Sequence, residues 1–361
     1  MPSIAYLLKN RIFNQETLVQ LLEADEQDTR LIFTESAAIR QKYVGNKVYL
    51  RGLIELSNIC DKDCLYCGIR KSNHKCDRYV VTDDEIARAI RYAVETKMGS
   101  VVIQSGELQT NNFVERMNKL LAMIWEIGKG ELGVTLSCGE QTEETYRHWF
   151  NLGATRYLLR IESSNEALYY KIHPKNEKHD FNVRLNALRV LKSVGYQTGT
   201  GVMIGLPFQT LNDLASDLLF MRDMDIDMCG MGPYIEHEDT PLYEYRETLM
   251  PFEQRLTLSM KMIALLRIIM KDVNIASTTA LQAIDKNGRV QALKIGANVM
   301  MPNITPGLYR NNYSLYLNKP GMDEEAEDSV RNLERQVSEA GCEVGYGQRG
   351  DAVHFSQRTK T

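Results

Sequence analysis

Short runs of apolar and β-branched residues alternate along the chain with longer segments of helical period. This alternation is typical of βα units arranged around a parallel sheet. Eight runs qualify as strands, and most segments between them have the amphipathic pattern of surface helices. The strands are expected to begin at Val48, Ser100, Gly133, Thr155, Thr198, Asp227, Asn274 and Ala297.

The segment 82–99 carries the clearest helix signals. It opens with a threonine or aspartate cap and an acidic first turn, and a glycine closes it. Further helices are expected over 113–127, 142–152, 182–194 and 211–224. About 45 residues before the first strand also have helical patterns.

Eight successive βα units favour an α/β fold of the TIM-type (β/α)8 barrel class. An open doubly wound sheet is the alternative, but the glycine-rich turn that usually follows its first strand is missing. We expect an N-terminal helical extension over 1–47, the barrel over 48–310, and a C-terminal capping segment with a polar tail over 311–361.

Composition and charge exclude several classes of protein. The chain has 43 basic and 47 acidic residues, and no basic run could follow a phosphate backbone, so nucleic acid is not an expected partner. The apolar stretch 258–271 is interrupted by Lys261 and Arg267, and it is shorter than the roughly 18 residues of a membrane span. Because no export signal is recognised at the start, we expect a cytoplasmic protein without a membrane partner.

Three of the seven cysteines, Cys60, Cys64 and Cys67, have the spacing C-x3-C-x2-C. The first strand is expected to end near Ser57, which places them in the loop where barrel enzymes carry their chemistry. Thiolates select zinc, copper(I) or iron–sulfur clusters, and three of them would leave one iron of a four-iron cluster open. The alternatives are a Cys3His zinc site completed by His74 and a chance grouping of cysteines.

Charged residues near other strand ends are further candidates. The fourth strand places Arg160 and Glu162 two positions apart, hence on one face, and opposite charges inside a barrel are costly unless they bind something. A plain interior ion pair is the alternative. The remaining cysteines are expected to be structural, because free cysteine commonly behaves as a small buried hydrophobe. They are Cys76, Cys138, Cys229 and Cys342.

The cysteine motif, with the aromatic Tyr66 before its third cysteine and a barrel strand before the whole, resembles the radical S-adenosylmethionine (radical SAM) superfamily. The resemblance implies a 4Fe-4S cluster on Cys60, Cys64 and Cys67, which are then the catalytic and metal-binding residues. It also implies S-adenosylmethionine on the open iron, cleaved reductively to methionine and a 5′-deoxyadenosyl radical. The protein would bind and orient this cofactor and exclude water and oxygen.

The resemblance extends to the cofactor and substrate contacts. "QSGE", ending at Glu107, is similar to the Gly-Gly-Glu motif that receives the methionine ammonium, with Ser105 in place of the first glycine. "GVMIGLP" is similar to the motif that cradles adenine. The implied cofactor-binding residues are Tyr66, Ser105, Gly106, Glu107, Glu162, Arg184, Gly201 and Ile204. The implied substrate-binding residues are Arg160, Thr278, Thr279, Asn303 and Tyr309.

Runs over nearly the whole chain, such as "MCGMGPYIEHEDTPL" and "GANVMMPNITP", look like the iron–iron hydrogenase maturases of the HydE family. The implied substrate is a small Fe(CO)2(CN)-cysteine species. The implied partners are other hydrogenase maturases and a reducing protein such as flavodoxin or ferredoxin. Some members carry a second cysteine trio near the C-terminus, but only Cys342 lies beyond Cys229 here, so we expect no accessory cluster of that type.

Two other functions stay open at this point. Methylornithine synthase, a radical mutase of similar sequence, is the enzymatic alternative, and a non-catalytic zinc-binding protein is the alternative of another class. Biotin synthase is disfavoured, because its second cluster needs cysteines on the second and fifth strands, where this chain has none.

Overall fold

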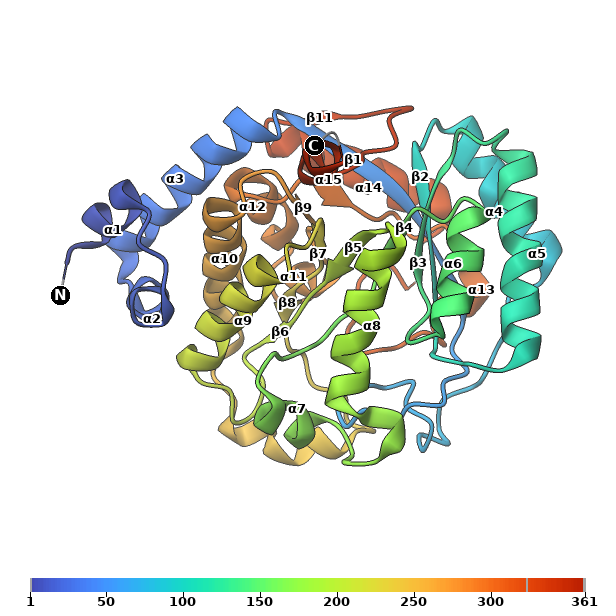
Figure 1. Cartoon of the computed structure of the whole chain (residues 1–361), viewed down its shortest axis with the longest axis horizontal. Coiled ribbons are helices and arrows are strands. Elements are labelled where there is room, and N and C mark those ends of the chain that lie inside the picture. Colours follow the sequence, from blue (N-terminus) through green and yellow to red (C-terminus); the bar gives the residue numbers. More distant parts are fainter. Residues whose placement is uncertain (1, 323, 360–361) are drawn as a thin grey trace.

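A computed structural model of the chain describes residues 2–322 and 324–359. Eight strands follow one another in a parallel sheet, and β10 pairs with β1. A parallel bridge between Ala276 and Val299 joins the end of β9 to β10 and closes the ring. The expected (β/α)8 barrel is therefore confirmed (Figure 1). The ring strands are β1 (Lys47–Ser57), β2 (Ser100–Ser105), β3 (Gly133–Ser137), β4 (Arg156–Leu158), β5 (Gln197–Thr200), β7 (Met228–Cys229), β9 (Asn274–Ile275) and β10 (Val299–Met300).

Two expected strands are each divided into two short ones. The chain continues beyond β5 as β6 (Met203–Ile204) and beyond β7 as β8 (Gly232–Pro233), and β6 and β8 pair only with each other. At the break, a Cβ on Gly201 would lie 2.0 Å from the carbonyl oxygen of Gly230, so this approach of two backbones requires glycine. The C-terminal ends of both strands thus leave the ring.

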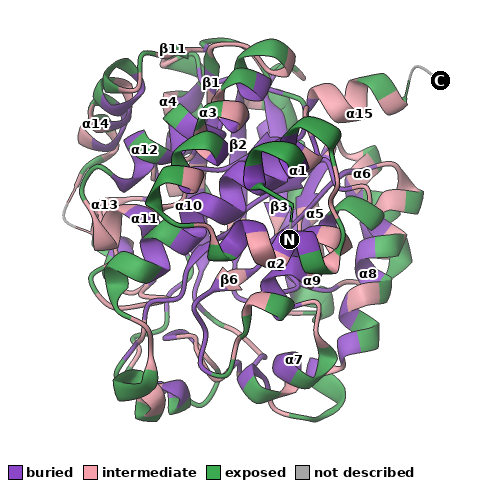
Figure 2. Ribbon diagram, turned by 90° about the vertical axis from the view of Figure 1, so that its left-hand side faces the viewer, coloured by how far each residue is buried: buried purple, intermediate pink, exposed green. Residues whose placement is uncertain are grey.

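Helices cover the outside of the barrel, and most of them bury one face (Figure 2). In the first of them the Thr82 hydroxyl accepts the Glu85 N–H, and the Glu85 carboxylate accepts the Thr82 N–H, which confirms the cap expected there. The outer helices are α4 (Asp83–Glu95), α5 (Asn111–Ile127), α6 (Glu143–Asn151), α8 (Phe181–Val194), α9 (Leu211–Asp223), α10 (Phe252–Ile269) and α12 (Gly288–Ile295).

The N-terminal helices explain why α10 is buried on nearly all sides. α3 packs along α10, and the Lys261 ammonium donates hydrogen bonds to Leu22 O and Ala24 O at the end of α2. These partners satisfy a cation that would otherwise be costly in the interior. The helices that precede the barrel are α1 (Ile4–Asn10), α2 (Gln15–Glu23) and α3 (Glu26–Tyr43).

Shorter elements occupy the ends of the barrel. No helix among the described residues is both long and apolar enough to cross a bilayer. The remaining helices are α7 (Glu166–Ile172), α11 (Thr279–Ile284), α13 (Gly307–Arg310), α14 (Ala326–Glu339) and α15 (Val353–Arg358), with 3₁₀ turns over Glu177–His179 and Pro241–Thr248.

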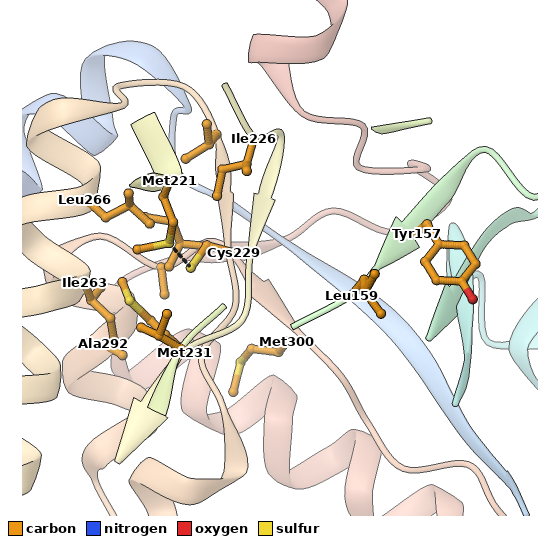
Figure 3. Close-up of a cluster of buried hydrophobic side chains, with 14 of the residues drawn as sticks. Tyr157, Leu159, Met221, Ile226, Cys229, Met231, Ile263, Leu266, Ala292 and Met300 are labelled. Atoms are coloured by element: carbon orange, nitrogen blue, oxygen red, sulfur yellow. Dashed lines mark hydrogen bonds between the residues drawn. The ribbon is translucent and has the colours of Figure 1, made fainter. Parts of the chain in front are cut away.

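Cys229, one of the four remaining cysteines, lies in the apolar layer between barrel and helices. Figure 3 shows Cys229 among Met221, Ile263 and Met231, with its thiol 3.6 Å from the Met221 sulfur. All are buried, and the flexible methionines fill the irregular space between β7 and the helices. This cysteine therefore has a packing role.

The C-terminal segment closes the N-terminal end of the barrel. β11 (Glu343–Val344) pairs with the first residues of β1, and residues 349–352 then cross the barrel floor. There Arg51 donates to Gly350 O at 3.0 Å, and Arg156 donates to the Asp351 carboxylate at 2.8 Å. Part of the tail expected from the sequence is thus a plug that supplies hydrogen-bond acceptors to two buried arginines. Residues 360 and 361 of that tail lie outside the described residues.

Asp351→Ala is expected to lower the free energy of unfolding by about 2 kcal/mol, because it leaves the fully buried Arg156 guanidinium without its countercharge. Urea unfolding measures this change. Glu339→Ala, which breaks an exposed pair with Arg335, is the matched control and should change stability by less than about 0.5 kcal/mol. Equal effects of the two substitutions would contradict the role of the plug.

Candidate active site

A cavity of about 320 Å³ lies at the C-terminal end of the barrel strands. It is the location at which barrel enzymes carry their chemistry. The structure brings most of the residues singled out in the sequence into its wall. These are Cys60, Cys64, Tyr66, Cys67, Ser105, Gly106, Glu107, Arg160, Glu162, Arg184, Thr278, Thr279 and Asn303.

Three candidates lie elsewhere. The Tyr309 hydroxyl donates to the Glu85 carboxylate at 2.9 Å, and its ring stacks on Tyr79, because α13 directs it toward α4. We therefore withdraw Tyr309 from the substrate contacts. Gly201 and Ile204 are buried but are not part of the cavity wall, where Met203 stands instead.

The loop that carries the cysteines is held by hydrogen bonds from side chains to backbone carbonyl oxygens. β1 ends at Ser57, as expected, and the Asn58 side chain then donates to Asp77 O and Asn312 O, both at 2.7 Å. The guanidinium of Arg78 donates to the carbonyl oxygens of Asn58 and Ile69. These bonds tie both ends of the loop together, so the thiols are presented on an ordered backbone.

The end of β2 lies directly against this loop. A Cβ on Gly106 would be 2.2 Å from the Ile59 carbonyl oxygen and 2.9 Å from the Cys60 Cβ, so only glycine permits the contact. The next residue, Glu107, donates its backbone N–H to the Cys60 sulfur at 3.3 Å. Hydrogen bonds of this kind tune thiolate ligands of iron–sulfur clusters.

Three thiols in this wall fit an iron–sulfur cluster by their chemistry. Burial raises the pKa of Cys60 and of Cys64, and it raises the pKa of Cys67 to about 12. Thiolates in such surroundings need a cationic partner, which iron supplies. Among the described residues, no three Cys, His, Asp or Glu side chains converge on a single metal ion. His74 is exposed and outside the wall, so the Cys3His zinc alternative has no support in the geometry.

Two acids and two bases form a buried quartet beside the thiols. Arg184 lies 2.7 Å from the Glu107 carboxylate and 2.9 Å from that of Glu140, and Lys62 lies 2.8 Å from Glu140. Burial acts to raise the pKa of Glu107, but Arg184 and Lys62 outweigh it, so the pKa is lowered and the carboxylate stays charged. Sequence reasoning missed Lys62 and Glu140. The sequence does contain a signal for Glu140, because the dipeptide Gly-Glu follows both the second and the third strand.

Arg160 and Glu162 form an ion pair in the cavity wall, with 2.8 Å between Nη2 and Oε2. Burial nevertheless raises the pKa of Glu162. Its backbone has φ 65°, a left-handed conformation that is strained for glutamate and is found preferentially at functional sites. The segment that follows is anchored, because Ser164 donates its N–H and hydroxyl to the buried Asp217 carboxylate at 2.7 and 2.6 Å.

Tyr66 is oriented by a histidine that the sequence analysis did not assign. His173 is buried and its pKa is lowered, first by burial and then by the charge of Arg184, so the ring is neutral. Its Nδ1 lies 3.0 Å from Tyr169 O and donates there, which leaves Nε2 to accept from the Tyr66 hydroxyl at 3.3 Å.

The cavity wall also contains Glu55, Tyr316 and Lys319, which the sequence did not single out. Glu55 is almost fully buried, lies 2.5 Å from the Lys319 ammonium and accepts a bond from the Asn303 amide. Thr279 and Tyr316 hydroxyls lie 2.7 Å apart. The four cysteines outside the motif are all absent from the wall.

Comparison with known proteins shows to which class of enzyme the chain belongs. Residues 54–221 match the model of the radical SAM superfamily. The structure of methylornithine synthase superposes with a TM-score of 0.79 at 22% identity, covering 95% of this chain and 97% of that one, which supports the fold. The protein is therefore a radical SAM enzyme, and its cofactors are a 4Fe-4S cluster and S-adenosylmethionine.

Sequence comparison narrows the class to a family. The chain is 43% identical, over 86% of its length and 86% of the relative, to the FeFe hydrogenase maturase subunit HydE of Thermotoga maritima. It is 27% identical, over 77% of its length and 75% of the relative, to 3-methylornithine synthase of Methanosarcina acetivorans. The chain belongs to the HydE family.

Asp217→Asn should become more stable relative to the native protein as the pH rises from 5 to 8. Burial raises the pKa of Asp217 to about 7, so the folded native protein holds a proton there that the unfolded chain releases near pH 4. The native protein therefore loses stability between pH 4 and 7, and the asparagine variant lacks this titration. Urea unfolding at both pH values measures the difference, and a difference independent of pH would contradict the assignment.

Proposed function

We propose that the chain is a hydrogenase maturase in which Cys60, Cys64 and Cys67 hold the cluster, and that its substrate is a small Fe(CO)2(CN)-cysteine species. The observation that carries this proposal is one cavity whose wall contains all three thiols, three members of the charged quartet (Lys62, Glu107 and Arg184) and the hydroxyls of Thr279 and Tyr316. One cavity can then hold cofactor and substrate in contact.

The residues on the side of β1 to β4 are suited to S-adenosylmethionine. A cluster held by Cys60, Cys64 and Cys67 would supply the single electron that cleaves the sulfonium reductively. Glu107, kept ionised by Arg184 and Lys62, would accept hydrogen bonds from the methionine ammonium. Arg184, which two carboxylates hold in place, would meet the methionine carboxylate, and Glu162 would accept bonds from the ribose hydroxyls.

The wall also limits side reactions. Apolar groups such as Leu158, Met203 and Ile235 line the space between the two sides, and Tyr66 is fixed by His173. These apolar groups would partly shield a reactive carbon in this space from water. Gly201 and Ile204, implied as adenine contacts, would act from behind this wall, through the position of Met203.

The same family assignment supports the partners. A protein such as flavodoxin or ferredoxin would deliver the electron, and other hydrogenase maturases would supply the substrate or receive the product. Both suit a cytoplasmic, anaerobic setting. A methylornithine synthase-like mutase is the second candidate, supported by sequence similarity, but its relative shares 27% identity against 43% for the maturase.

Cys64→Ala should abolish cluster assembly, because two thiolates cannot replace three in holding the cube of iron and sulfide. After anaerobic reconstitution, iron and sulfide should fall to background and no deoxyadenosine should be formed. Cys76→Ala removes a nearby thiol that is outside the cavity wall and should retain the native iron content. Retained cleavage of S-adenosylmethionine in Cys64→Ala would contradict the proposal.

Anaerobic turnover distinguishes the two candidate functions. The reconstituted protein is incubated with reductant, S-adenosylmethionine and either the Fe(CO)2(CN)-cysteine species or lysine, and consumption of each is followed. The proposal predicts that the iron species is consumed with one deoxyadenosyl group transferred or released per turnover, and that lysine is unchanged. Consumption of lysine alone would assign the mutase activity instead.

A further inference from the structure

One cation of the cavity wall forms no ion pair with the described residues, and the charge of Glu324 acts on it only from beyond ion-pair distance. Four of its cationic side chains lie within 2.8 Å of a carboxylate, and these are Lys62, Arg160, Arg184 and Lys319. The fifth is Arg289, the second residue of α12. It is 5% exposed, and none of the carboxylates among the described residues forms an ion pair with it.

Hydrogen bonding does not satisfy this side chain either. The Arg289 Nε is buried without an acceptor, and Nη1 reaches only the Gln282 amide oxygen at 3.5 Å, the limit of a hydrogen bond. A buried guanidinium with neither an ion pair nor full hydrogen bonding is costly. An anionic ligand group would remove that cost.

The position of Arg289 separates it from the cofactor side. α12 follows β9, which stands opposite β3 in the ring of eight strands. The thiols and the charged quartet follow β1, β2, β3 and β4. Arg289 therefore faces the substrate side of the cavity, together with the hydroxyls of Thr278, Thr279 and Tyr316.

These hydroxyls suit an anion as well. Burial raises the pKa of Tyr316 to about 12, so the phenol keeps its proton. In the pair with Thr279, one O–H donates within the pair and the other is left to donate to a ligand. A planar guanidinium beside a free O–H donor matches a carboxylate, which can accept two parallel bonds from the fork and one more from the hydroxyl.

We propose that Arg289, with the Thr279–Tyr316 pair, is the binding site for the carboxylate of an amino-acid portion of the substrate. This assignment rests on the proposed function only in that the substrate carries such a portion. It makes Arg289 a specificity-determining residue that selects substrates with one negative charge at this end of the cavity.

The test uses the full chain, reconstituted anaerobically and loaded with S-adenosylmethionine but without reductant. Isothermal titration calorimetry compares two pairs of probes that differ only in the carboxylate: L-cysteine with cysteamine, and L-lysine with cadaverine. The native protein should bind the carboxylate-bearing member of at least one pair about tenfold more tightly.

Arg289→Met should reduce this preference to less than about threefold without weakening the probe that lacks a carboxylate. Arg289→Lys keeps the charge and volume but not the fork, so it should fold and show an intermediate preference. Lys294→Met removes an exposed cation from the same helix and should leave the preference unchanged. Equal affinity of the native protein for both members of each pair, or an unchanged preference in either Arg289 variant, would overturn the proposal.

The outcomes also separate this inference from the proposed function. A preference confined to the lysine pair, lost in Arg289→Met, supports the carboxylate site and contradicts the hydrogenase substrate. Turnover of the iron species by a protein that shows no carboxylate preference supports the proposed function and contradicts the site.

Discussion

The contact between the end of β2 and the cysteine loop determines the geometry of the active site. At Gly106 the two backbones are so close that a single added carbon would overlap the Ile59 carbonyl oxygen. This contact places the backbone N–H of Glu107 on the Cys60 sulfur, and it places the Glu107 carboxylate beside Arg184 and Lys62. The Cys60 sulfur and the charged groups that we propose bind the cofactor are therefore fixed relative to each other by one glycine.

Charge compensation is the second constraint on the cavity. Nearly every ionised group in the wall forms an ion pair with a group of opposite charge, either in the wall or directly behind it. Glu140, for example, pairs with both Lys62 and Arg184. Buried charges persist only where partners or ligands satisfy them. The groups that have no such partner therefore indicate ligands. The three desolvated thiols are suited to binding iron, and Arg289 is suited to binding an anion.

The parts of the site that follow from local sequence could be predicted. Cys60, Cys64 and Cys67 form a motif within one loop, and the alternation of strands and helices locates that loop at the catalytic end of a barrel. Glu107 follows β2 and Glu162 follows β4 of the same parallel ring, so strand position alone brings them to the same rim.

Residues whose role depends on long-range packing could not be predicted. Lys319 meets Glu55 across more than 260 positions, which no local pattern records. Arg289 differs from the other cations of the wall because it forms no ion pair with the described residues, and no local pattern records that either. Tyr309 lies outside the cavity wall because its hydroxyl donates to Glu85 of α4 and its ring stacks on Tyr79, contacts that sequence alone does not reveal. The plug at residues 349–352 looked like a solvated tail because its partners, Arg51 and Arg156, lie on distant strands.

The proposed chemistry requires a cluster in which one iron has no ligand from the protein. Mössbauer spectroscopy of the reconstituted protein, before and after addition of S-adenosylmethionine, tests this most directly. We expect the signal of one iron site to change on addition while the others stay the same, and Cys64→Ala to show no cluster signal. A spectrum that S-adenosylmethionine leaves unchanged, or a cluster whose irons all respond alike, would contradict it.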